Sequence, residues 1–97
     1  MNKNKAGRIL TLYFIDCFIE AAIAVGLNKN MAKKFIIPTF IGSVSYLVAS
    51  RKDPKELIKM VASKGGTTEA ALKVFKRHHF DKKISDMYKK LLKVVVE

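Results

Sequence analysis

The sequence contains few of the residues on which several classes of small protein depend. Of its 97 residues, one is cysteine, two are proline and none is tryptophan, and only 8 are acidic. The lone cysteine, Cys17, cannot close a disulfide within the chain, and no cluster of cysteine and histidine has the spacing of a metal site. The sequence therefore predicts neither a disulfide-stapled nor a zinc-stabilised domain, and we expect a reducing, cytoplasmic setting.

Membrane-spanning and export segments are also not evident. The longest uncharged stretch, Phe35 to Ser50, contains Pro38 and several small polar residues, and it is shorter than the roughly 18 to 20 apolar residues that a span needs. The N-terminus begins with basic residues, as signal peptides do, but Asp16 and Glu20 interrupt its apolar run. We expect no membrane partner and no export.

Basic and apolar residues are abundant. Lysine and arginine number 19, the formal net charge is +11, and 49% of the residues are hydrophobic, so the chain is not disordered in composition. We interpret residues 1–97 as a single helical domain. Because a domain this small buries only about 60% of its unfolded surface, a partner subunit would help to complete its core.

Apolar residues recur every three or four positions, and no segment alternates with a period of two. This pattern predicts an all-α fold, a bundle of four to five helices. The most apolar helix, which contains Phe35 to Ser50, is apolar nearly all round and must be surrounded by protein. Pro38 removes one backbone hydrogen bond within it, so we expect a kink there and not a break.

The ends of the helices carry recognisable signals. The first predicted helix runs from Gly7 to Val25, with Gly26 as a left-handed C-cap. The second is capped by Asn28 or Asn30 and runs to about Arg51, and Asp53 and Pro54 open a short third helix. Thr67 or Thr68 caps the fourth helix, and Asp81 caps the last.

The segment Ser63-Lys64-Gly65-Gly66-Thr67-Thr68 is the strongest candidate for a binding site. Two adjacent glycines allow close approach of a ligand to the backbone, and the first N–H groups of the following helix favour an anion. An ordinary turn between two helices is the alternative interpretation. The spacing of a phosphate-binding P-loop is missing.

The chain from Phe14 to Phe80 resembles, without a gap, the C-terminal domain of pyrroline-5-carboxylate reductases. FIDCFIEAAIAVGL is similar to the family's FIEALADAGVKLGL, Thr39 and Gly42 fall on its Q-T-x-x-G, and Asp53 to Leu57 matches its H-P-x-E-L. Val61 to Thr68 with Leu72 looks like its V-T-S-P-G-G-T-T-x-x-x-L.

The resemblance implies a helical domain that interlocks with a second copy as a homodimer. In the full enzyme, a separate nucleotide-binding domain holds NADPH or NADH, and hydride transfer to 1-pyrroline-5-carboxylate gives L-proline. The family's substrate carboxylate lies at the S-P-G-G-T-T turn, which corresponds here to Ser63, Gly65, Gly66, Thr67 and Thr68. No G-x-G-x-x-G fingerprint occurs in this chain, so we expect no Rossmann domain, no cofactor, no catalytic residue and no activity from this chain alone.

Two departures from the family limit this transfer. Lys64 replaces the family's proline, and the segment Asn4 to Leu10 shares only Gly7 with the family's S-G-S-G-P-A-Y. One alternative is therefore a stand-alone, non-catalytic helical dimer descended from that domain. The sequence leaves open the choice between NADPH and NADH and any assembly beyond a dimer.

The remaining candidates have simpler explanations. Asp16 and Glu20 are one helical turn apart and fit a solvated edge, Cys17 fits a small buried apolar residue, and His78 and His79 fit a turn better than a metal site. A basic nucleic-acid-binding module is a further alternative, but the lysines are spread over every helix without interleaved aromatics, which favours solvated faces.

Overall fold

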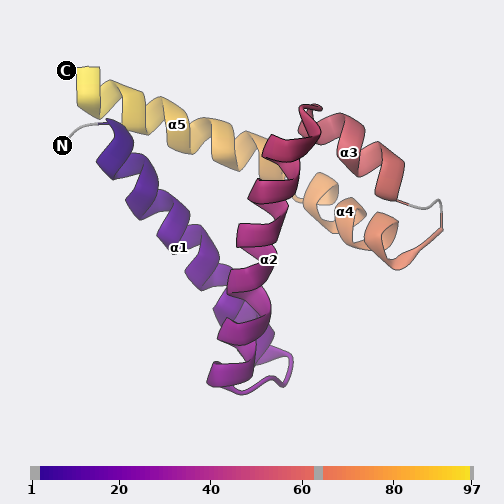
Figure 1. Ribbon diagram of the computed structural model, residues 1–97. Helices are drawn as coiled ribbons and strands as arrows, with labels where there is room; N and C mark the ends of the chain where they lie inside the picture. The colour runs from indigo at the N-terminus through magenta and orange to yellow at the C-terminus, as the bar shows by residue number, and fades with distance from the viewer. Residues whose placement is uncertain (1–2, 63–64, 97) are drawn as a thin grey trace. The chain divides into compact units, whose positions relative to one another are not determined.

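The structure, a computed structural model, describes residues 3–62 and 65–96 (Figure 1). These residues form five helices and no strand: α1 (Lys3–Ala24), α2 (Lys29–Ser50), α3 (Pro54–Val61), α4 (Thr67–Arg77) and α5 (Phe80–Val96). The predicted all-α fold is confirmed. Contacts divide the chain into two units, Met1–Lys52 with α1 and α2, and Asp53–Glu97 with α3, α4 and α5.

Helices α1 and α2 form an antiparallel pair joined by a short turn, as Figure 1 shows. Gly26 has φ 120°, its N–H donates to Ile23, and the N–H of Leu27 donates to Ala22. This is the Schellman arrangement that satisfies the last carbonyl groups of a helix. The C-cap predicted at Gly26 is confirmed, whereas α1 begins at Lys3, earlier than the predicted Gly7.

A cluster of three phenylalanines joins α1 to α2. Phe14 and Phe18 lie one turn apart on α1 with ring centroids 5.0 Å apart. Phe40 of α2 meets both edge-on, at 6.2 Å from Phe14 and 5.2 Å from Phe18. Edge-to-face packing is a favourable geometry for aromatic rings, so this cluster fixes where the two helices cross.

Helix α2 runs through Pro38 without a break, as predicted. The hydroxyl of Thr39 donates to the carbonyl of Phe35 at 2.8 Å, next to the Lys34 carbonyl that Pro38 deprives of its helical donor. The helix ends where Arg51 adopts φ 58°. The kink at Pro38 stays a prediction.

The second unit consists of three shorter helices. Asp53 is the N-cap of α3 and Pro54 is its first residue, as predicted, although the Asp53 side chain makes no capping hydrogen bond. Helices α4 and α5 meet at a turn in which His79 has φ 53°, and the rings of Phe75 and Phe80 lie 4.7 Å apart on either side of it.

Two predicted caps are wrong. The N-cap of α4 is Gly66, with φ −86° and ψ 177°, and Thr67 and Thr68 lie inside the helix. Asp81 lies in the first turn of α5, because the left-handed conformation at His79 allows the helix to begin at Phe80. The cap of α4 lies one residue before Thr67, and α5 begins at Phe80, directly after His79 and two residues earlier than a cap at Asp81 would allow.

We predict that Asn28→Ala destabilises the chain by about 1 kcal/mol, the usual cost of removing an N-cap. The Asn28 side chain accepts a hydrogen bond from the N–H of Met31 at 2.9 Å, which Ala cannot replace. Urea unfolding followed by circular dichroism at one protein concentration measures the change. Asn30→Ala is the matched control, since Asn30 lies inside the exposed first turn of α2, and an equal loss in both variants would contradict the assignment of the cap.

Candidate functional site

The glycine-rich turn lies between α3 and α4. Helix α3 ends at Val61, and the N–H of its C-cap Ala62 donates to the carbonyl of Ile58. Gly65 has φ 79°, and Gly66 is the N-cap of α4. A residue with a Cβ is strained at the φ of Gly65, so glycine is needed there. Two residues of the predicted site segment, Ser63 and Lys64, lie outside the described residues.

The turn presents the open N-terminus of α4. The N–H of Ala70 donates to the carbonyl of Gly66, which is the first hydrogen bond of the helix. By helix geometry, the N–H groups before it have no acceptor within the helix and carry the positive end of its dipole. Thr67 and Thr68 are exposed, and Gly66 provides no side chain to cap these groups. The arrangement suits a carboxylate or phosphate.

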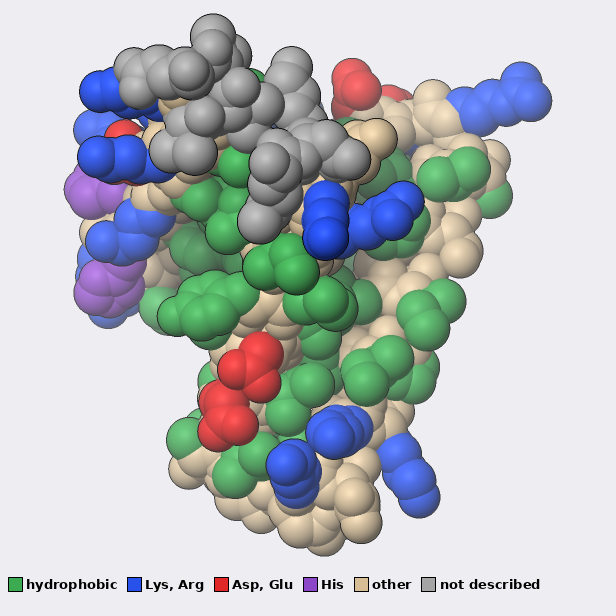
Figure 2. All heavy atoms as spheres, turned by 90° about the vertical axis from the view of Figure 1, so that its left-hand side faces the viewer, with side chains coloured by type: hydrophobic (Ala, Val, Ile, Leu, Met, Phe, Trp, Pro, Cys, Tyr) green, Lys and Arg blue, Asp and Glu red, His purple; other side chains and the backbone are tan. Residues whose placement is uncertain are grey.

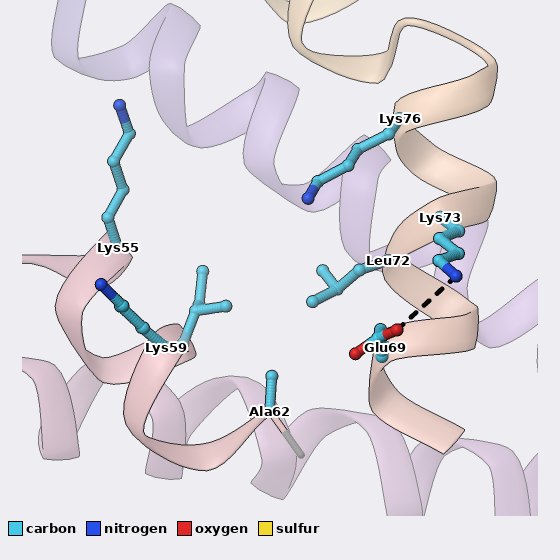
Figure 3. Close-up of a pocket in the computed structure, with 8 residues that line it drawn as sticks. Lys55, Lys59, Ala62, Glu69, Leu72, Lys73 and Lys76 are labelled. Atoms are coloured by element: carbon cyan, nitrogen blue, oxygen red, sulfur yellow. Dashed lines mark ion pairs between the residues drawn. The ribbon is translucent and has the colours of Figure 1, made fainter. Parts of the chain in front are cut away.

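An acidic side chain of the protein already lies at this end of α4. The Glu69 carboxylate accepts a hydrogen bond from the N–H of Gly65 at 3.1 Å, and it pairs with the Lys73 ammonium group at 3.5 Å. Figure 3 shows the second contact as a dashed line. Glu69 was not predicted from the sequence, although an acid three residues after a helix N-cap often turns back to accept from the N-cap N–H. Here the acceptor reaches the N–H one residue before the cap.

A basic pocket adjoins the same turn within the second unit. It has a volume of about 460 Å³, and α3 and α4 provide its lining. Lysines dominate that lining, and Glu69 is its one acidic residue; the residues are Lys55, Ile58, Lys59, Ala62, Glu69, Leu72, Lys73 and Lys76. Figure 3 shows Lys76 extending from α4 toward α3, with Leu72 pointing into the same space.

The other candidate residues stand apart from this turn in the sequence and have no site of their own. Asp16 and Glu20 are exposed on α1, and His78 and His79 form the turn that ends α4, as predicted. Cys17 is exposed and not buried, which corrects the prediction. In the described part of the chain, no group of three or more potential ligands could hold a metal ion.

Much of the apolar surface of the first unit is uncovered. Ile37, Ile41, Val44 and Val48 share one face of α2, which we call the α2 stripe, and their exposed fractions are 41%, 63%, 60% and 72%. Figure 2 shows many apolar side chains open to solvent on the side of the molecule that it presents. The prediction that α2 is surrounded by protein is therefore not met by this chain alone. Cys17 of α1 is exposed as well, because no described part of the chain covers it.

Helix α2 is long and apolar enough to cross a membrane, by length and composition only. One such helix among the described residues is weak evidence for a span, because the core helix of a soluble protein passes the same test.

Comparison with known proteins identifies one family. A family model described as pyrroline-5-carboxylate reductase dimerisation matches residues 7–97. Pyrroline-5-carboxylate reductase 2 of Bacillus subtilis is 39% identical over 71 residues, which make up 73% of this chain and 26% of that protein. The reductase of Pseudomonas aeruginosa is 34% identical over 67 residues, 69% of this chain and 24% of that protein.

The reductase of Escherichia coli is 33% identical over 67 residues, 69% of this chain and 25% of that protein. The chain thus spans about a quarter of the length of the curated relatives it matches. The similarity covers the helical segment that our sequence analysis compared with the same family.

We predict that Glu69→Gln lowers the stability of the chain by about 0.5 kcal/mol, because it removes a negative charge from the N-terminal end of α4 and from the Lys73 pair. Urea unfolding at low salt measures the change. The difference should shrink at about 1 M salt, where exposed charges are screened. Glu20→Gln is the control, since Glu20 lies near the C-terminal end of α1, where an acid is not favoured. An equal or larger loss in that control would contradict the role of Glu69.

Proposed function

The chain belongs to the pyrroline-5-carboxylate reductase dimerisation family, and from this premise we propose that it is the C-terminal dimerisation and substrate-carboxylate-binding domain of such a reductase. The activity is that of an oxidoreductase of proline biosynthesis, which reduces 1-pyrroline-5-carboxylate to L-proline with NADPH or NADH. We place the protein in the cytoplasm. The single observation that carries the proposal is the glycine-capped N-terminus of α4 in a chain of this family.

The nicotinamide cofactor does not fit the residues described. The chain's glycines lie inside helices, at Gly7 and Gly42, or in turns between helices, at Gly26, Gly65 and Gly66. No described strand precedes any of them, as a dinucleotide-binding turn requires. We therefore assign the cofactor to the nucleotide-binding domain of the full enzyme and derive no step of the reaction from it here.

The role of this chain is then to hold and orient the substrate. Its proposed contacts are backbone N–H groups at Gly66, Thr67 and Thr68, with the threonine hydroxyls beside them; Gly65 and Ser63 complete the predicted turn. A carboxylate held by the positive end of α4 keeps the ring of the substrate at a fixed position. Orientation of the two reactants supplies a large share of the rate in reactions of this kind.

A second copy of this chain is the proposed partner. The α2 stripe and the exposed residues Leu12 and Tyr13 of α1 give the first unit an apolar surface that a monomer would leave in water. An obligate homodimer interface has this apolar character. The interlocked arrangement that the family resemblance implies would bury it.

We predict that the chain runs at about twice its 10.9 kDa mass in multi-angle light scattering, and that Val48→Glu shifts it toward the monomer. Val48 is 72% exposed on the α2 stripe, so burial in an interface would place an unpaired carboxylate in an apolar setting. Val25→Glu makes the same chemical change at the turn after α1, where Val25 is 84% exposed, and should leave the mass unchanged. A monomeric parent chain, or equal dissociation of both variants, would refute the dimer.

We predict that L-proline shifts the amide NMR signals of Thr67 and Thr68 in the parent chain. Gly66→Val should abolish the shift by blocking close approach to the backbone, and Thr67→Ala should weaken binding about fivefold by removing one hydroxyl. Ser85→Ala removes an exposed hydroxyl from α5 and should change nothing. If the parent chain gives no shift, the carboxylate site is wrong, whatever the oligomeric state.

A further inference from the structure

The basic pocket between α3 and α4 holds more positive charge than the proposed substrate site uses. Four lysines line it, two from each helix, and the single acid of the lining is Glu69, which pairs with Lys73. Within the described residues, Lys55, Lys59 and Lys76 have no acidic partner. Three positive charges therefore share one pocket without compensation.

The spacing of these lysines is not what helix stability favours. Lys55 and Lys59 are four residues apart on α3, and Lys73 and Lys76 are three apart on α4, so each pair lies on one face of its helix. Like charges at that spacing repel and weaken a helix. An anion between the two helices would relieve the repulsion on both walls at once.

The floor of the same pocket is apolar. Ile58, Ala62 and Leu72 line it, and Figure 3 shows Leu72 pointing into the space that the lysines surround. Its volume of about 460 Å³ lies within the range of sites that hold small organic ligands. A ligand with several negative charges and an apolar ring would match both the lysines and the apolar residues of this lining.

We propose that this pocket binds a small organic polyphosphate, with the phosphates on Lys55, Lys59 and Lys76 and an apolar ring on Ile58 and Leu72. Lysine is a common phosphate ligand, and three uncompensated ammonium groups match the charge of a di- or triphosphate better than that of one carboxylate. The pocket is distinct from the backbone donors of Gly66 to Thr68, and the proposal does not depend on the reductase activity.

Titration of the full chain with ATP in magnesium-free buffer, followed by the NMR signals of Ile58 and Leu72, tests the proposal. Lys59→Ala combined with Lys76→Ala removes one charge from each wall and should weaken binding about tenfold. Lys83→Ala combined with Lys90→Ala removes the same charge from exposed positions of α5. This control should weaken ATP binding less than about twofold, because salt screens charges that are far from the ligand. An equal loss in the two double variants would show diffuse attraction and overturn the site.

Two further arms sharpen the test. Glu69→Gln removes the one acid in the lining and should tighten ATP binding about threefold, whereas Glu20→Gln on α1 should not. Inorganic triphosphate should bind more weakly than ATP, because it has nothing to place on the apolar floor. Equal affinity for ATP and triphosphate, or no tightening in Glu69→Gln, would overturn the proposal. Circular dichroism of every variant checks that the helices are intact.

Discussion

The apolar character of α2 on all sides is the constraint from which the rest of the first unit follows. A helix can place only one face against a single neighbour, and α1 occupies that face through Phe14, Phe18 and Phe40. Of the residues of α2, Ala32 is the one that the described chain buries. Since apolar surface contributes to stability only when it leaves water, the exposed α2 stripe contributes little to the stability of the first unit by itself.

The candidate site in the second unit rests on a different interaction, between a helix terminus and negative charge. Gly66 caps α4 without a side chain, which leaves backbone donors available, and Glu69 satisfies the N–H of Gly65 just before them. The Glu69 carboxylate therefore already reduces the positive potential that an external carboxylate would meet at this turn. In the site that we propose, substrate binding would depend on the helix dipole, the nearby lysines and one acid of the protein itself.

Local signals in the sequence account for most of the fold. The turn at Gly26, the cap at Asn28 and the start at Asp53-Pro54 could be predicted because each depends on the conformation of only a few neighbouring residues. The N-cap at Gly66 could not, since glycine makes no capping hydrogen bond and the threonines beside it favour the cap position more strongly. Burial was the least predictable property, because it depends on which faces of the helices pack together: Cys17 is exposed, since no described part of the chain covers it.

The glycine pattern and the family resemblance both pointed to the turn, but neither pointed to the residues around it. A motif match transfers only the positions that the motif contains, so Ser63 and Gly65 to Thr68 were predicted and Glu69 was not. Its role follows from geometry, because a residue three positions after the N-cap points back toward the turn. The lysines of the pocket could not be predicted from a motif either. The sequence contains many lysines, and it is the placement of α3 and α4 that brings these four to one pocket.

The positions of the donors in the turn are only as well fixed as the helices on either side. Helix α3 has 8 residues and α4 has 11, and isolated helices shorter than about 12 to 15 residues are marginal in water. Their order must therefore come from packing: Leu57 is the buried residue of α3, and α4 has no buried residue among those described. The geometry of the proposed site thus depends on how well the two helices beside it are packed.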